Sequence, residues 1–128
     1  MQVRNLMKQP VVTVAADQSV RQAARRMQEH VIGSVVVTDG DRLAGILTER
    51  DVLHAVAEDR DLDQTPAGDL MTTELVTAGP NWDVVVAASV MTSNRIRHLV
   101  VKNNEQLLGV LSLRDVLSVY LPDQVHEQ

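Results

Sequence analysis

Two seven-residue segments of the chain carry side chains that could bind a small polar ligand. Gly45–Asp51 reads GILTERD and Gly109–Asp115 reads GVLSLRD, so a hydroxyl residue precedes an aspartate by three positions in each. Each segment lies where an expected strand ends and an expected helix begins. Backbone N–H groups and the helix dipole favour polar or anionic ligands at such a place. A carboxylate that accepts hydrogen bonds from two vicinal hydroxyls would hold a ribose.

The same residues also fit a purely structural role. Thr48 with Asp51, and Ser112 with Asp115, have the spacing of a helix N-cap, in which the side chains satisfy backbone N–H groups. This interpretation needs no ligand, and it is compatible with ligand binding. The glycine at the start of each segment would allow another part of the backbone to approach closely. The spacing therefore leaves both roles open.

The two segments belong to an internal duplication of the whole chain. Residues 6–57 align with residues 70–121 at an offset of 64 positions without a gap, and about a third of the aligned pairs are identical. Such self-similarity indicates one structural unit present twice. Apolar spacing and turn residues predict the order strand, helix, strand, strand, helix in each unit. The expected strands are 11–14, 34–38, 43–47, 75–77, 98–102 and 107–111, and the expected helices begin near Ser19, Thr48, 83 and 112. Ser19 and Gln22 have the spacing of a capping box, and Gly33 is the predicted stop of the helix that begins near Ser19.

These elements define a fold class and a domain organisation. The second and third strands form an antiparallel hairpin, and the first strand joins in parallel through a right-handed crossover. A unit of about 55 residues buries too little surface alone. We therefore expect an α/β (α+β) fold of two β-α-β-β-α units, related by a pseudo-twofold axis and packed through their sheets. The predicted domains are residues 1–60 and 70–128, joined by a linker at 61–69 that follows an acidic stretch.

Composition excludes several classes of protein. The chain has 128 residues, 12 basic and 17 acidic side chains and no cysteine. Disulfides and thiolate zinc sites are therefore excluded, and the net charge of −5 argues against a general nucleic-acid binder. We also expect no membrane span, no secretory signal and a cytoplasmic location. With two aromatic residues, Trp82 and Tyr120, the core must be aliphatic.

The duplicated unit resembles a known family. The resemblance rests on Leu6-Met7 leading into Val11–Val14, on Gly45–Asp51, on the copies of both, and on Ile96–Val101. These segments are similar to the cystathionine β-synthase (CBS) domain in a tandem pair, the Bateman module, over about residues 5–121. The resemblance implies a regulatory sensor of adenosyl ligands (AMP, ADP, ATP or S-adenosylmethionine) that acts on an unidentified protein partner. It also implies a homodimer, as a disc of four CBS units. A ligand-free scaffold protein is the alternative.

The resemblance also implies two clefts between the units. In the family the aspartate holds the ribose and the hydroxyl residue supports it. The first cleft would comprise Thr48, Asp51, Thr77, Arg97 and His98, and the second Thr13, Ser34, Ser112 and Asp115. Arg97-His98 occupies the position of phosphate-contacting basic residues, whereas the counterpart of that pair, Gly33-Ser34, is uncharged. We therefore expect phosphorylated ligands in the first cleft, and an uncharged adenosyl group or no ligand in the second.

Catalysis by the chain itself is not expected. No nucleophile or oxyanion hole accompanies Glu49 and Asp51. His54 could join them as metal ligands, but Glu49 and Asp51 do not share a helix face, so no metal site is predicted. Trp82 has no aromatic counterpart in the other repeat and is interpreted as a packing residue.

Overall fold

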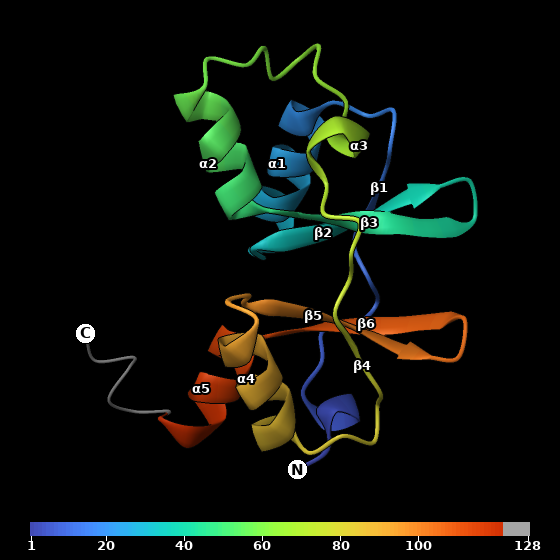
Figure 1. The fold of residues 1–128 in the computed structure, drawn as a ribbon, viewed down its shortest axis with the longest axis vertical. Helices are drawn as coiled ribbons and strands as arrows, with labels where there is room; N and C mark the ends of the chain where they lie inside the picture. The colour runs from blue at the N-terminus through green and yellow to red at the C-terminus, as the bar shows by residue number, and fades with distance from the viewer. Residues whose placement is uncertain (122–128) are drawn as a thin grey trace. The chain divides into compact units, whose positions relative to one another are not determined.

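The computed structural model describes residues 1–121 and divides into two compact units. Each unit contains one three-stranded sheet with helices packed against it (Figure 1). The residues expected to end the second repeat, 122–128, lie outside the described part. The elements in chain order are η1 (Val3–Asn5), β1 (Thr13–Ala15), α1 (Val20–His30), β2 (Ser34–Asp39), β3 (Arg42–Thr48), α2 (Glu49–Ala57), α3 (Ala67–Leu70), β4 (Thr77–Ala78), α4 (Val84–Ser93), β5 (His98–Asn103), β6 (Gln106–Ser112) and α5 (Leu113–Tyr120).

The two sheets have the same topology and register. β1 pairs with β2 in parallel and β2 with β3 antiparallel, and β4, β5 and β6 repeat this order. Both hairpins have an irregularity at equivalent positions, between Val37 and Thr38 and between Val101 and Lys102. The predicted α+β class and the duplicated element order are therefore confirmed.

The compact units do not follow the repeats along the chain. One, the first-sheet unit, comprises Val12–Leu75, and the other, the second-sheet unit, comprises Met1–Val11 with the chain from Val76 onward. The segment before β1 thus belongs to the unit of β4–β6, because the fully buried Val3 joins that unit's core. The first-sheet unit therefore runs from inside the first repeat into the start of the second, and the second-sheet unit combines the start of the first repeat with the rest of the second.

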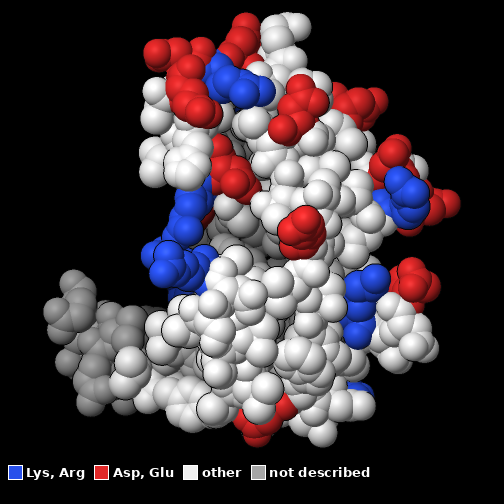
Figure 2. All heavy atoms as spheres, viewed as in Figure 1, with Lys and Arg blue, Asp and Glu red and all other residues white. Residues whose placement is uncertain are grey.

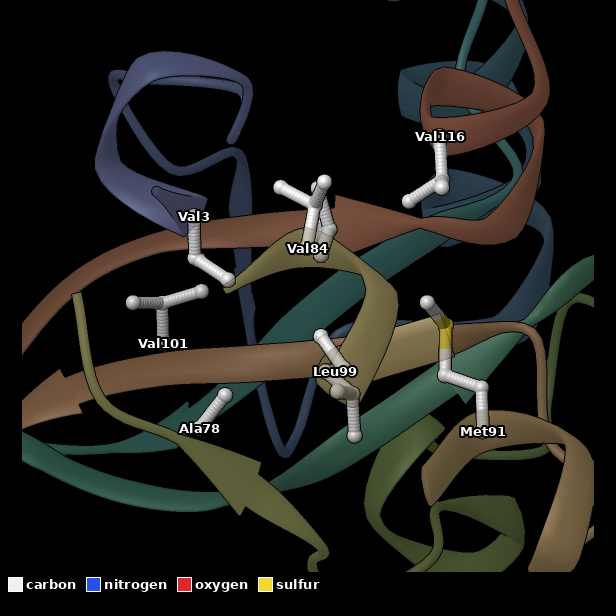
Figure 3. Close-up of a cluster of buried hydrophobic side chains, with 9 residues drawn as sticks. Val3, Ala78, Val84, Met91, Leu99, Val101 and Val116 are labelled. Atoms are coloured by element: carbon white, nitrogen blue, oxygen red, sulfur yellow. The ribbon is translucent and has the colours of Figure 1, made fainter. Parts of the chain in front are cut away.

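The cores are aliphatic, as the composition requires. In the second-sheet unit, Val3 from η1 and Met91 from α4 lie with Leu99 and Val101 of β5 (Figure 3). In the first-sheet unit the core is formed by buried side chains of β1, α1, β2, β3 and α3, namely Val14, Ala23, Met27, Val35, Val37, Leu47 and Ala67. Burial of this apolar surface holds the helices on the sheets and so fixes where each strand passes into the next helix.

The ends of α1 show one prediction confirmed and one corrected. Ser19 caps the helix, accepting a hydrogen bond from the Gln22 N–H while the Gln22 side chain accepts from the Ser19 N–H. The helix ends at His30, and Val31 adopts the left-handed conformation at φ 53°. Gly33, which the sequence suggests as the stop, instead precedes β2. Its carbonyl accepts a hydrogen bond from the Glu49 N–H at the start of α2.

Residues 61–69, assigned to a linker by the sequence, pack on the first-sheet unit. The carbonyls of Leu62 and Thr65 accept hydrogen bonds from the first turn of α1, and Asp63 pairs with Arg21. Ala67, at the start of α3, is fully buried. This segment is thus a structural part of the unit as well as a connection.

Candidate functional site

The hydroxyl and carboxylate at the start of α2 form a capping box. The Asp51 Oδ2 atom accepts hydrogen bonds from the Thr48 N–H at 2.8 Å and from the Thr48 hydroxyl at 3.0 Å. In return, the Asp51 N–H donates to Thr48 Oγ1 at 3.3 Å. These contacts fix the carboxylate over the first turn of the helix, and Asp51 is half-buried. The capping interpretation of the sequence is therefore confirmed at this position.

The start of α5 has nearly the same arrangement. The Asp115 Oδ2 atom accepts from the Ser112 N–H at 3.3 Å, and the Asp115 N–H donates to Ser112 Oγ at 3.0 Å. The side chain of Asp115 is 15% exposed. Both helices of the duplicated motif therefore begin on a carboxylate that the chain itself orients.

Capping leaves binding capacity on each carboxylate. A carboxylate offers about four lone-pair sites, and all the capping contacts of Asp51 and Asp115 use Oδ2. Among residues 1–121, nothing donates a hydrogen bond to the Oδ1 atom of either aspartate. Each Oδ1 can therefore accept from hydroxyl groups of a ligand while the cap stays intact, so the two roles that the sequence left open are compatible in the structure.

The glycine of each motif admits a second backbone segment. A Cβ atom on Gly45 would lie 2.6 Å from the Thr72 carbonyl oxygen, and one on Gly109 would lie 2.8 Å from the Lys8 carbonyl oxygen. Thr72 forms backbone hydrogen bonds in both directions with Ile46, at 3.0 and 2.9 Å, and Lys8 does the same with Val110, at 2.8 and 3.2 Å. The close approach expected from the glycines is confirmed.

This approach brings an additional charge to one motif. The Lys8 Nζ atom lies 3.8 Å from the Asp115 Oδ1 atom. The residue equivalent to Lys8 beside the Asp51 motif is the uncharged Thr72. Lys8 was not predicted as a site residue from the sequence. The offset of 64 aligns Lys8 with Thr72, but only the structure shows that the segment before β1 packs on β6 and so brings Lys8 to Asp115.

The other predicted residues lie at the same end of the sheets as the motifs. In the first-sheet unit, Ser34 pairs with Thr48 across β2 and β3. In the second-sheet unit, His98 pairs with Ser112, and the Arg97 carbonyl accepts a hydrogen bond from the Leu113 N–H at 2.8 Å.

The two remaining residues begin the first strand of each unit. Thr13 is the first residue of β1 and Thr77 the first residue of β4. The first-sheet unit thus holds Thr13, Ser34, Thr48 and Asp51, and the second-sheet unit holds Thr77, Arg97, His98, Ser112 and Asp115. Each of the two sites predicted from the sequence therefore includes residues of the first-sheet unit and residues of the second-sheet unit.

Other features of residues 1–121 do not overlap these motifs. A cavity of about 340 Å³ opens beside the start of α1, lined by Asp17, Ser19, Arg21, Gln22, Arg25, Asp63, Gln64 and Pro66. No three histidine or acidic side chains in this part of the chain are grouped so as to hold a metal ion. Nor does any helix in it combine the length and apolar character needed to cross a bilayer.

Comparison with known proteins identifies the duplicated unit. The profile of the CBS domain matches residues 3–58 and again residues 67–122. A CBS domain-containing protein of Bacillus subtilis, YhcV, is 36% identical over 115 residues, which cover 89% of this chain and 81% of that protein.

Solved structures agree with this match. The CBS-domain containing protein ATU1752 from Agrobacterium tumefaciens superposes with a TM-score of 0.87 at 36% identity, covering 94% of this chain and 93% of that one. The CBS domain protein PAE2072 from Pyrobaculum aerophilum, solved in complex with AMP, gives a TM-score of 0.83 at 36% identity, with 90% and 89% covered.

Proposed function

This chain belongs to the CBS-domain family as a tandem pair of CBS domains, and we propose that it is a regulatory module that binds adenosyl ligands. The observation that carries the proposal is the geometry of the two duplicated carboxylates. Asp51 and Asp115 are each oriented by a capping box that uses one oxygen and leaves the other available. A carboxylate placed in this way can accept hydrogen bonds from the vicinal hydroxyls of a ribose. The similar protein solved with AMP carries a ligand of this kind.

Each site would be completed by the residues that the family resemblance assigns to it. Thr77, Arg97 and His98 would serve the ligand held by Asp51, and Thr13 and Ser34 the ligand held by Asp115. A guanidinium group binds phosphate through two parallel hydrogen bonds. Arg97, which is exposed at the entrance to β5, is therefore proposed to contact the phosphate of a nucleotide.

Titration calorimetry with AMP, ATP and S-adenosylmethionine tests the proposal. We expect heat of binding for at least one of these ligands and a matching rise in the melting temperature, because a ligand that binds only the folded state stabilises it. Absence of heat and of thermal shift for all three would support the alternative, a CBS protein that acts only as a scaffold.

Substitution of Arg97 separates ligand binding from stability. Arg97→Ala should weaken AMP binding by roughly tenfold, the value of one charge-assisted contact, while the melting temperature of the ligand-free protein changes little because the side chain is exposed. Arg95→Ala, at another exposed position before β5, is the matched control and should leave AMP binding unchanged. Equal loss in both variants would show a general charge effect rather than a contact.

We further propose a homodimer that uses the second helix of each repeat. On α2, Leu53 is 64% exposed and Val56 is 53% exposed, and α5 exposes Leu117 and Tyr120. Few charged side chains surround α4 and α5 on the face shown in Figure 2, and α4 itself carries none. Exposed apolar side chains on a helix are typical of interaction surfaces, and each unit has such a helix.

Light scattering at micromolar concentration tests the assembly. The chain should have the mass of a dimer, and Leu53→Glu should shift it toward the monomer because an unpaired carboxylate would be buried. Val31→Glu, at an exposed valine outside both helices, is the matched control and should remain dimeric. A monomeric wild-type protein would contradict this part of the proposal.

A further inference from the structure

Lys8 gives the Asp115 motif a charge that its duplicate lacks. Its Nζ atom lies 3.8 Å from Asp115 Oδ1. This distance is too long for a hydrogen bond, so the ammonium group does not occupy the acceptor positions of the carboxylate. It nevertheless lies close enough to offset the negative charge of the aspartate.

The backbone of Lys8 is fixed in this place. Its N–H and carbonyl both bond to Val110 on β6, and Gly109 presents no Cβ to obstruct it. The side chain is 65% exposed, so the ammonium group can turn from the carboxylate toward a bound anion without being withdrawn from a buried site. Lys8 is therefore a cation held at the edge of the motif, with no other acidic partner among residues 1–121.

The first-sheet unit provides an internal comparison. Thr72 makes the same pair of backbone hydrogen bonds, with Ile46 in place of Val110, and also passes over a glycine, Gly45. Its side chain carries no charge. Among residues 1–121, Asp115 therefore has a cationic partner in its own unit, whereas no lysine or arginine forms an ion pair with Asp51.

We propose that Lys8 is a specificity-determining residue that makes the Asp115 site accept an anionic, phosphorylated adenosyl ligand. This inference rests on the proposed function and deepens it. Because Ser34 is uncharged, the sequence predicts an uncharged ligand or no ligand at this site. The charge that Lys8 adds reduces the repulsion between the Asp115 carboxylate and a phosphate, and its ammonium group can donate to the phosphate directly.

A pair of probes that differ only in charge tests this inference. Calorimetry with AMP and with adenosine is carried out on Asp51→Ala protein, in which the Asp115 site is the remaining ribose site. Lys8→Thr, which copies the residue of the other motif, should weaken AMP binding by roughly fivefold, the upper range for an exposed charge pair, and leave adenosine binding unchanged. Lys102→Thr, on the β5–β6 hairpin at the end away from Ser112, removes the same charge and should change neither.

The outcomes separate this inference from the proposed function. If the wild-type protein binds neither probe, the proposed function is wrong and this inference with it. The second outcome concerns Lys8 alone. If Asp51→Ala protein binds AMP, but Lys8→Thr weakens the binding of AMP and adenosine equally or changes neither, the role of Lys8 is wrong while the proposed function stands. If the wild-type protein binds the probes but Asp51→Ala protein does not, the Asp115 site takes neither ligand and the inference is also overturned.

The reverse substitution provides an independent arm. Thr72→Lys in Asp115→Ala protein places a lysine at the equivalent position beside Asp51. It should tighten AMP binding by a similar factor without affecting adenosine. An unchanged ratio of the two affinities would contradict the electrostatic role assigned to this position.

Discussion

Substitution of Gly109 by alanine tests whether the segment before β1 is held against β6 as the structure describes. The new Cβ atom would lie 2.8 Å from the Lys8 carbonyl oxygen and 2.9 Å from the Met7 Sδ atom. The methionine side chain can move away, but the carbonyl oxygen accepts the 3.2 Å hydrogen bond from the Val110 N–H. Relief of the contact therefore requires that the backbone segment move away from the strand.

The cost can be worked out from these contacts. Overpacking at a rigid position costs about 1–3 kcal/mol, and a lost backbone hydrogen bond costs about 1 kcal/mol. The lower entropy of the unfolded alanine chain offsets about 0.4–1 kcal/mol. We therefore expect Gly109→Ala to lower the free energy of unfolding by about 2 kcal/mol. Gly45→Ala should cost at least as much because its Cβ would lie 2.6 Å from a carbonyl oxygen.

Urea unfolding followed by circular dichroism measures this loss. Gly40→Asn is the matched control, because Gly40 lies at φ 63° with nothing within 4 Å of its Cβ position and asparagine tolerates this conformation. The control should stay within about 0.5 kcal/mol of the wild type. A Gly109→Ala protein as stable as the wild type would refute the close packing of residues 7 and 8 on β6.

Three further substitutions test individual features of the fold by urea unfolding. Val31→Asn should stabilise the protein by about 1 kcal/mol, because an exposed β-branched residue is replaced in the left-handed region; lower stability would contradict the Val31 C-cap. Ser19→Ala should cost about 1 kcal/mol through loss of the cap, and a neutral result would contradict the capping box. Val3→Ala should cost about 2 kcal/mol because Val3 is a core residue, whereas the exposed Gln2→Ala should be neutral; equal stability of the two variants would contradict the core position of Val3.

Much of the fold follows from local patterns in the sequence. The repeat, the two hairpins and the capping boxes depend on residues close together along the chain, such as Ser19 with Gln22, and all were predicted. The C-cap at Val31 was not, because a β-branched residue is an unfavourable choice there and Gly33 offered a better local stop. The helix is closed here by backbone hydrogen bonds from the Val31 and Ile32 N–H groups to the Gln28 and Met27 carbonyls, while the Val31 side chain is exposed.

The candidate site likewise has one feature that the local sequence predicts and one that depends on tertiary structure. The pairing of Thr48 with Asp51 is local and was predicted from spacing alone. The approach of Lys8 to Asp115 joins residues more than a hundred positions apart, and it depends on which unit receives the segment before β1. Nothing in the local sequence specifies that choice, so this charge could be found only in the structure.

The central claim is that Asp51 and Asp115 hold the two hydroxyls of a ribose. Calorimetric comparison of adenosine with 2′,3′-dideoxyadenosine tests it most directly, because the two ligands differ only in those hydroxyls. We predict that the wild-type protein binds adenosine more than tenfold tighter, as expected for hydrogen bonds to a charged acceptor, and that the Asp51→Ala, Asp115→Ala double variant loses this difference. Equal affinities of the wild-type protein for the two nucleosides would contradict the claim.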